Sequence, residues 1–298
     1  MDKINRRNFL KKAAAIASVA AVSTQVAEAT PTNILSDERM GVLVDTTVCI
    51  GCRHCEWACK EAHNIPAGQL DEYHDRSVFK KFRRPNEKAL TVVNEFENPK
   101  NELAPIYVKA QCNHCDHPAC VSACIVGAFS KLENGSVVWD GSKCIGCRYC
   151  MVACPFQVPT FEYDKAIEPR IMKCDFCIER TKQCMLPACV EICPMEVMTY
   201  GPRNEIIQVA KERIALYPGR YENYIYGEKE VGGTSWVYIG SKKMWELGMP
   251  KLKLSPAPGV SESIQHGIFA YFVPPIALYS LLGGIMWLTK KRSDLEEE

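Results

Sequence analysis

The sequence predicts an α+β fold of two repeated, cysteine-bearing modules followed by a single transmembrane helix. Three observations support this prediction. The chain of 298 residues contains 17 cysteines, their spacing recurs along the chain, and an uncharged apolar run lies near the C-terminus. The formal net charge of +1 gives no electrostatic reason to expect nucleic-acid binding. We divide the chain into a signal peptide at 1–29, a cysteine-rich domain at 30–255 and a membrane-anchoring tail at 256–298.

The N-terminus has the features of a twin-arginine (Tat) export signal. Arg6 and Arg7 precede a mildly apolar, Ala-rich stretch at 13–22, and Ala27-Glu28-Ala29 has the small-x-small pattern that signal peptidase cleaves. We expect cleavage after Ala29, with an ordinary amphipathic helix as the alternative. The Tat pathway exports folded proteins, so this signal suits a domain that acquires a cofactor in the cytoplasm before export.

The C-terminal tail contains the predicted transmembrane helix at 268–288, a run of 21 uncharged residues. About 20 residues are enough to cross the hydrocarbon core of a bilayer. The basic residues 290–292 follow, and the positive-inside rule places them in the cytoplasm. The cysteine-rich domain would then lie on the periplasmic face of the membrane, held by a single-pass anchor. A buried core helix is the alternative. His266, just before the run, is interpreted as interfacial packing, with a haem or quinone site as the alternative.

Sixteen of the cysteines fall into four groups. The first and third are spaced C-x2-C-x2-C-x3-C, as in bacterial ferredoxins. The second is spaced C-x2-C-x4-C-x3-C, and the fourth has an eleven-residue gap at its middle. In chain order the groups are Cys49, Cys52, Cys55 and Cys59; Cys112, Cys115, Cys120 and Cys124; Cys144, Cys147, Cys150 and Cys154; and Cys174, Cys177, Cys189 and Cys193.

This spacing favours iron–sulfur clusters over other uses of cysteine. Soft thiolates select iron–sulfur clusters, zinc or Cu(I) over hard cations. Zinc sites use C-x2-C pairs rather than three cysteines within one short run, and cysteines this close together would pair poorly as disulfides. We therefore predict four [4Fe–4S] clusters, with the sixteen cysteines as iron ligands, in two ferredoxin-like modules.

An internal repeat predicts which groups share a module. Residues 45–59 resemble residues 140–154, and residues 118–124 resemble residues 187–193. Ferredoxin-like modules have a pseudo-two-fold, so we pair group one with group four and group two with group three. In two-cluster ferredoxins the fourth cysteine of a run binds the neighbouring cluster. The predicted ligand sets are Cys49, Cys52, Cys55 with Cys193; Cys174, Cys177, Cys189 with Cys59; Cys112, Cys115, Cys120 with Cys154; and Cys144, Cys147, Cys150 with Cys124.

The segments between the cysteines carry secondary-structure signals. Short helices should end at Pro155 and Pro194, and a longer helix is expected at 204–216. The basic run 76–84 is interpreted as a solvated strand face, with a docking surface for a partner as the alternative. Further strands are expected at 41–46, 106–110, 136–140 (after the turn at 134–135) and 235–239.

The remaining polar residues suggest no catalytic site. His54, His114 and His117 lie in the cysteine loops, where we expect them to form hydrogen bonds or face solvent, because cysteines already complete the ligand sets. Cys184 is interpreted as a non-ligand, with a reactive free thiol as the alternative. The chain shows no Ser-His-Asp arrangement, P-loop or GxGxxG fingerprint. We expect an electron carrier without a substrate site of its own.

The four cysteine groups, in this order and with Pro-Ala-Cys-Val at 187–190, resemble the four-cluster ferredoxin-like subunits of the molybdopterin oxidoreductase family. A narrower resemblance, to HybA-type subunits of hydrogenase 2, covers nearly the whole chain. It rests on residues 6–9, 147–155, 226–230, 232–234 and 261–266. The chain departs from the wider family at Ile125, where a proline is usual, and at Cys184, where many relatives have a glycine.

The resemblance implies electron transfer through the four clusters. A HybA-type subunit would pass electrons between a periplasmic [NiFe] hydrogenase, with its small and large subunits, and an integral membrane subunit that reacts with quinone. The alternative is the equivalent iron–sulfur subunit of a formate dehydrogenase, or of another molybdopterin or cytochrome complex.

Overall fold

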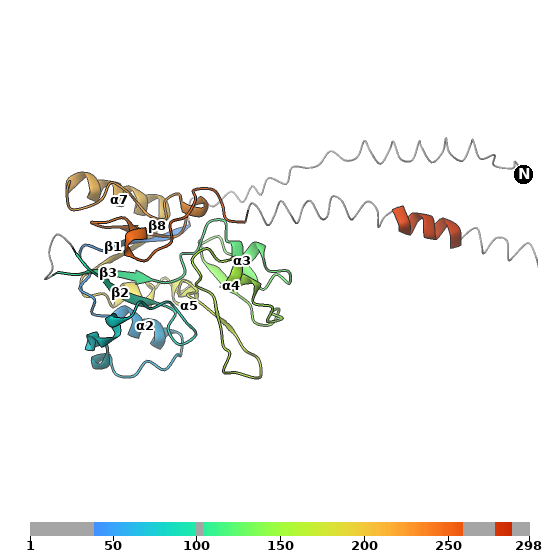
Figure 1. Ribbon diagram of the computed structural model, residues 1–298, viewed down its shortest axis with the longest axis horizontal. Helices are drawn as coiled ribbons and strands as arrows, with labels where there is room; N and C mark the ends of the chain where they lie inside the picture. Colours follow the sequence, from blue (N-terminus) through green and yellow to red (C-terminus); the bar gives the residue numbers. More distant parts are fainter. Residues whose placement is uncertain (1–38, 99–103, 259–277, 288–298) are drawn as a thin grey trace, which may run out of the picture. The chain divides into compact units, whose positions relative to one another are not determined.

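Each cysteine group follows directly on a short β-strand (Figure 1). The computed structural model describes residues 39–98, 104–258 and 278–287. The predicted signal peptide and His266 lie outside the described residues, as does more than half of the predicted transmembrane run. Residues 278–287 are helical. Of the helices in the described ranges, none has both the length and the apolar character needed to cross a membrane.

A three-stranded sheet in the order β8-β1-β9 joins the first and last cysteine groups. β1 (Met40–Asp45) pairs antiparallel with β8 (Met198–Pro202) and parallel with β9 (Trp236–Ile239). β1 leads into group one, and β8 follows group four. The pairing of these two strands therefore brings together segments that are more than 150 residues apart in the chain.

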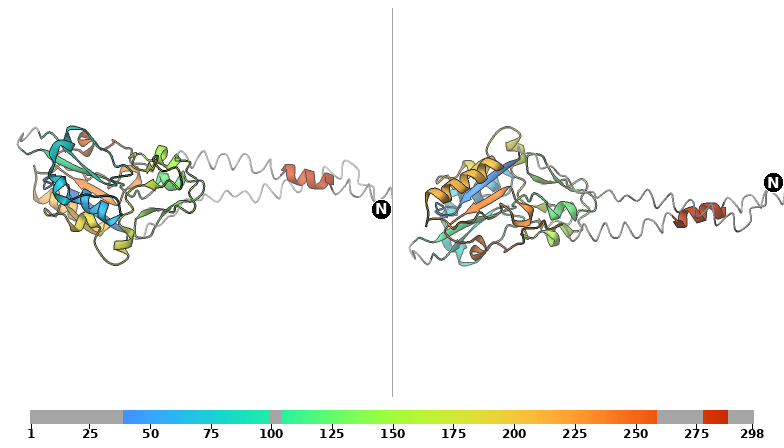
Figure 2. Two further views of the ribbon diagram at one scale, coloured as in Figure 1. Left: turned by 90° about the horizontal axis from the view of Figure 1, so that it is seen from below. Right: turned by 90° about the horizontal axis from the view of Figure 1, so that it is seen from above.

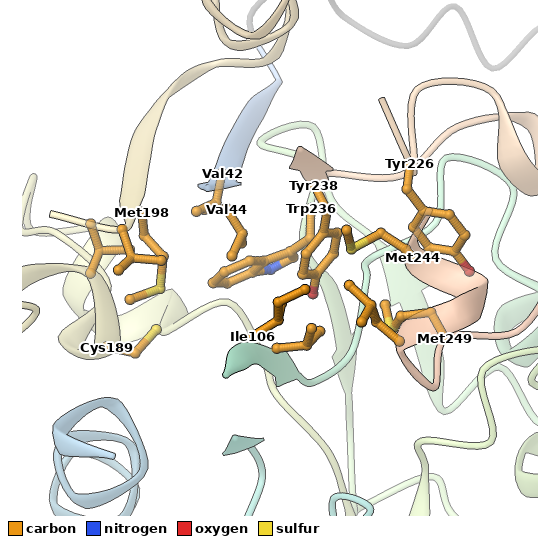
Figure 3. Close-up of a cluster of buried hydrophobic side chains, with 14 of the residues drawn as sticks. Val42, Val44, Ile106, Cys189, Met198, Tyr226, Trp236, Tyr238, Met244 and Met249 are labelled. Carbon is orange, nitrogen blue, oxygen red and sulfur yellow. The ribbon is translucent and has the colours of Figure 1, made fainter. Parts of the chain in front are cut away.

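The two faces of this sheet bury different partners, because successive side chains of a strand point to opposite sides. Leu43 packs on one face with Ile206 and Ala210 of α7 (Arg203–Leu216), which lies along the sheet (Figures 1 and 2). Val42 and Val44 point to the other face, where they meet Trp236 and Tyr238 of β9 and the strand β3 (Ile106–Ala110) (Figure 3). This second face carries the larger part of the core and borders the cysteine loops.

Three antiparallel hairpins carry the remaining strands. They are β2 (Val92–Phe96) with β3 (Ile106–Ala110), β4 (Phe129–Lys131) with β5 (Val137–Trp139), and β6 (Thr160–Phe161) with β7 (Ile171–Met172). The second strand of each hairpin leads into group two, three or four respectively. The strands expected at 41–46, 106–110, 136–140 and 235–239 are confirmed to within one residue at each end.

The short helices pair in a way that divides the cysteine groups into two halves. α2 (His54–Ala62) of group one packs against α6 (Ala188–Glu191) of group four, and α3 (Ala119–Ser122) of group two packs against α4 (Tyr149–Ala153) of group three. The remaining helices are α5 (Ile178–Thr181) and four 3₁₀ helices, η1 (Leu70–His74), η2 (Arg76–Lys80), η3 (Glu230–Gly232) and η4 (Met244–Leu247).

The short helices end slightly before the prolines that were expected to close them. α4 ends at Ala153, and Cys154 already has extended backbone angles (φ −72°, ψ 115°). Proline disfavours helical angles in the residue before it, so Pro155 forces Cys154 out of the helix. The longer helix expected at 204–216 is confirmed as α7, one residue longer at its start.

The prediction of a strand within the basic run 76–84 is wrong. Its first part is the 3₁₀ helix η2, and the rest has no regular structure. The side chain of Asp75 accepts hydrogen bonds from the backbone N–H (2.8 Å) and the hydroxyl (2.6 Å) of Ser77. Such a cap starts a helical turn, and Arg53 holds its N-terminal end by donating to the carbonyl oxygen of Asp75 (3.1 Å).

Arg203, at the start of α7, ties the group two loop to the C-terminal part of the domain. Its buried guanidinium donates to the carbonyl oxygens of Thr234 (2.7 Å), Gly227 (3.2 Å) and Glu228 (3.0 Å). It also lies 3.7 Å from the carboxylate of Asp116, which is 1% exposed and pairs with Arg39 at 3.2 Å. Cys115 immediately precedes Asp116, so this network positions a cysteine loop.

We expect Arg203→Met to destabilise the domain by about 2–4 kcal/mol, because it leaves buried carbonyl oxygens without donors. The measurement is the urea midpoint for loss of the visible cluster absorbance. Lys211→Met is the matched control, since Lys211 lies on the same helix in an exposed ion pair with Glu228 (3.0 Å). The control should cost no more than about 1 kcal/mol. Equal midpoints for the two variants would contradict the assigned role of Arg203.

Candidate metal centres

Three cysteines of group one and one cysteine of group four surround a small interior cavity. Cys49, Cys52, Cys55 and Cys193 line it, together with Lys109. These four thiols are called set one from here on. The first three come from the loop between β1 and α2, and Cys193 comes from the segment between α6 and β8. The β1–β8 pairing is therefore what brings Cys193 to the group one loop.

A second cavity repeats this arrangement in the other half of the domain. Cys112, Cys115, Cys120 and Cys154, called set three, line it together with Lys173. Cys154 arrives from the end of α4, which packs against α3 of group two.

Two further sets consist of one thiol and the three neighbouring thiols whose charges raise its pKa. Burial raises the pKa of Cys59 well above its usual value, and the neighbouring thiols of Cys174, Cys189 and Cys177 raise it further. These four residues are called set two. Burial likewise raises the pKa of Cys150 to about 11, with contributions from Cys147, Cys144 and Cys124. These four are called set four.

In sets one and three the structure thus brings one cysteine to three from a different group. That the four thiols of each set bind one cluster stays a prediction.

The C-I-G-C-R sequence shared by groups one and three has a conformational basis. Gly51 and Gly146 have φ of 70° and 69°, and Arg53 and Arg148 have φ of 64° and 59°. Two left-handed residues in one short loop fold it back on itself, which is easiest for glycine at the first position. A side chain at position 51 would also collide with the ring of Tyr107, because a Cβ there would lie 2.4 Å from it.

The loops also direct backbone N–H groups at the cysteine sulfurs. The N–H of Ala128 donates to Cys124 Sγ at 3.1 Å, and that of Val197 donates to Cys193 Sγ at 3.4 Å. Gly146 and Phe176 make similar bonds, each at 3.4 Å, to Cys144 and Cys174. Donors of this kind orient thiolate ligands and tune the reduction potential of a bound cluster.

Several of the cysteine thiols are buried enough to resist ionisation on their own. Burial raises the pKa of Cys49 to about 11, and those of Cys120 and Cys177 to about 12. Metal binding requires the thiolate and releases the proton. Four thiols around an interior space, with backbone donors on the sulfurs, fit a [4Fe–4S] cluster in both donor chemistry and number.

Two histidines of the cysteine loops pack against other rings. His114 is completely buried, and its Nδ1 accepts a hydrogen bond from the N–H of Val137 (2.9 Å). Burial lowers its pKa well below the usual value, and Lys173 and Lys131 lower it further. Its neutral ring packs on Phe176 with centroids 4.9 Å apart. His54 packs near His74 in the same way (5.9 Å).

His63 was not identified from the sequence. Its Nε2 lies 2.7 Å from Asp175 Oδ1, and its Nδ1 lies 2.7 Å from the carbonyl oxygen of Cys59. Burial acts to lower the pKa of His63, but the hydrogen bond and the charge of Asp175, with the hydrogen bond to Cys59, together outweigh burial and raise the pKa overall. The pair holds the end of α2 to the group four loop. Its only sequence signal is the spacing of four residues from Cys59, one helical turn.

Two features of the surface stand apart from the four sets. Cys184 is exposed, in the loop after α5. A larger cavity, of about 780 Å³, is lined by residues such as Lys211, Tyr221 and Leu254 and contains no cysteine. We assign neither of them a role in binding clusters.

Comparison with known proteins agrees with these centres. Residues 48–128 match a family model described as a 4Fe-4S dicluster domain, and residues 103–203 match a second model with the same description. Two dicluster domains and sixteen grouped cysteines provide for four [4Fe–4S] clusters in an α+β, ferredoxin-like fold.

Three relatives extend the similarity beyond the cysteines. A protein of Nitratidesulfovibrio vulgaris is 47% identical over 300 residues, covering 100% of this chain and 80% of the relative. The hydrogenase-2 operon protein HybA of Escherichia coli O157:H7 is 31% identical over 320 residues, covering 97% and 96%. The iron-sulfur subunit of the nitrate-inducible formate dehydrogenase of Escherichia coli K12 is 34% identical over 217 residues, covering 70% and 71%.

One conclusion follows from the four thiol sets, the two dicluster matches and the relatives aligned over most of their length. The chain belongs to the family of ferredoxin-like 4Fe–4S dicluster subunits that includes HybA and the formate dehydrogenase iron–sulfur subunits, and it transfers electrons through 4Fe–4S clusters.

Proposed function

We propose that this protein relays electrons between a periplasmic [NiFe] hydrogenase and an integral membrane subunit that reacts with quinone. The observation that carries the proposal is alignment coverage. HybA aligns over nearly the full length of both chains, whereas the formate dehydrogenase subunit aligns over about seven tenths of each. The identities are close to each other, at 31% and 34%, so coverage and not identity separates the two types. The equivalent role in a formate dehydrogenase is the second candidate.

The packing of the thiols supports a linear relay. Cys189 of set two lies in one buried cluster with Cys49, Cys55 and Cys193 of set one. Cys174 of set two packs with Cys112 and Cys154 of set three. Cys120 of set three packs with Cys150, Cys124 and Cys144 of set four. The sets therefore follow one another in the order one, two, three, four.

Bound clusters supply one-electron chemistry, and the residues of the chain decide where that chemistry meets a partner. Set four lies nearest the surface, because Cys147 is exposed. Ile125, Ile145 and Val152 are exposed beside it in sequence, Val152 to 81%. We place one partner at this end of the relay, since a covering subunit would bury these apolar side chains.

The location of the relay follows from the two chain ends. We propose export by the Tat pathway and a single C-terminal membrane anchor at 268–288. Support comes from the twin arginines, the small-x-small pattern and the uncharged run followed by basic residues.

The ligand sets can be tested by the iron content of paired substitutions. Cys52 and Cys193 belong to one proposed set, whereas Cys52 and Cys59 belong to two. We expect Cys52→Ala/Cys193→Ala to lose about as much iron as Cys52→Ala alone, and Cys52→Ala/Cys59→Ala to lose about twice as much. Wild type should hold about sixteen irons, four per cluster.

The control for this comparison is Cys184→Ala, which should retain all the iron because Cys184 lies outside the four sets. If each group of four cysteines instead held its own cluster, the two double variants would exchange their results.

The identity of the partner can be tested by purifying the tagged, membrane-extracted chain and identifying what accompanies it. We expect the large and small subunits of a [NiFe] hydrogenase, detected by mass spectrometry and by nickel analysis. A molybdopterin-containing subunit, with molybdenum in place of nickel, would overturn the hydrogenase proposal in favour of the second candidate.

The export route can be tested with Arg6→Lys/Arg7→Lys. Because the Tat machinery reads the arginine pair, we expect this variant to remain in the cytoplasmic fraction with its iron bound. The measurement is cell fractionation with immunoblotting. Lys11→Arg/Lys12→Arg serves as a control that changes neighbouring basic residues and leaves export intact. Normal membrane association of the first variant would refute the assignment.

A further inference from the structure

Lys109 is a buried cation beside set one. It lies on β3 and is only 3% exposed. Its side chain lines the cavity of set one, beside Cys49, Cys55 and Cys193. A lysine is rarely buried so completely without a partner of opposite charge, so the groups around its ammonium need to be identified.

Neutral groups hold the ammonium in place. Nζ of Lys109 donates to the side-chain oxygen of Gln111 (2.9 Å) and lies 4.3 Å from the centre of the Trp236 ring. The amide of Gln111 in turn donates to the hydroxyl of Tyr238 (2.6 Å). None of these groups carries a negative charge, so they fix the position of the cation without neutralising it.

No carboxylate forms an ion pair with Lys109 in the part of the chain that the structure describes. Glu56, the buried carboxylate next to Cys55, is matched by Arg53 (3.2 Å) and Arg83 (2.5 Å). Lys131, another buried lysine, differs because Asp116 lies 3.8 Å from it. The counter-charge for Lys109 must therefore come from the cysteines.

The electrostatics of the two thiol sets agree with this conclusion. Burial acts to lower the pKa of Lys109, but Cys189, Cys55 and two further neighbours, Tyr238 and Cys174, in their ionised forms together outweigh burial and raise the pKa above its usual value. In return, Lys109 acts to lower the pKa of five thiols in the two sets, against the effect of their burial: Cys49, Cys55, Cys59, Cys174 and Cys177.

We propose that Lys109 is a positioning residue whose fixed positive charge raises the reduction potential of the cluster held by set one. The inference rests on the proposed function, since it assumes a cluster in this set. A reduced cluster carries one more negative charge than an oxidised one. A cation held nearby in a medium of low dielectric constant therefore stabilises the reduced form more. The cluster of set one would accept electrons more readily because of Lys109.

Lys173 provides a comparison in the other half of the domain. Its side chain lines the cavity of set three, and Nζ donates to the carbonyl oxygens of Val137 (2.5 Å) and Cys174 (2.9 Å). Of the thiols, its charge acts on Cys120 of set three. Removing the charge of Lys173 should therefore affect a cluster that removing the charge of Lys109 does not.

The test is a redox titration of the full, membrane-extracted chain followed by electron paramagnetic resonance. The variants are Lys109→Met, Lys109→Gln, Lys109→Arg and Lys173→Met. The signal of set one is assigned by its loss in Cys52→Ala. We expect both neutral variants to lower the reduced-to-oxidised ratio of this signal at least tenfold at a fixed potential, which is about 59 mV. Lys109→Arg should stay close to wild type, and Lys173→Met should leave the midpoint of the set one signal unchanged.

The possible failures are distinguishable. Unchanged midpoints in a neutral variant with full iron content would overturn the tuning role of Lys109 and leave the relay intact. Loss of iron in both neutral variants, with retention in Lys109→Arg, would show that the charge serves assembly and would also overturn it. A wild-type chain without iron and acid-labile sulfide would instead overturn the proposed function itself.

Discussion

The meeting of one cysteine with three others from a distant segment is the constraint on which this fold depends. Cys193 reaches the group one loop only because β8 pairs with β1 and α6 packs on α2. Cys154 reaches the group two loop only because α4 packs on α3. Each contact closes a long loop, whose entropic cost rises slowly with length, and a bound cluster would link the two ends. The packing of Cys174 with Cys112 and Cys154 then joins the two halves.

Burying so many thiols disfavours their charged form, and groups elsewhere in the interior offset this cost. A thiolate is strongly disfavoured away from water, as the raised pKa values of Cys49 and Cys120 indicate. Backbone N–H donors on the sulfurs and buried lysines beside the cavities stabilise the negative charge. His114 remains neutral among these cations and supplies packing rather than charge. Glu56 is acceptable next to Cys55 because two arginines match it.

Features that depend on local sequence could be predicted well. Of the features that depend on distant neighbours, only the pairing of the cysteine groups was predicted, because the internal repeat relates those groups. The strands before the groups and α7 were found because periodicity and turn residues are local signals. The basic run was assigned the wrong structure, although the Asp75-Ser77 cap that starts η2 is also local and was overlooked. The burial and the partners of Lys109 and His63 were not predicted, for a different reason. Their partners Trp236 and Asp175 lie more than 100 residues away, and an isolated lysine or histidine on a short element gives no sign of burial.

By itself the sequence determined which residues carry the chemistry. The spacing of the cysteines specified sixteen thiols, the soft-metal chemistry they support and the repeat that relates their groups. Only the tertiary structure decided which thiols share an interior space, the order in which the four sets follow one another, and which charges lie beside them. The physical reason is distance along the chain. Ligand spacing is set within a loop of a few residues, whereas the position of Cys193, Cys154 or Lys109 is set by strand and helix pairings between segments that are not neighbours in sequence.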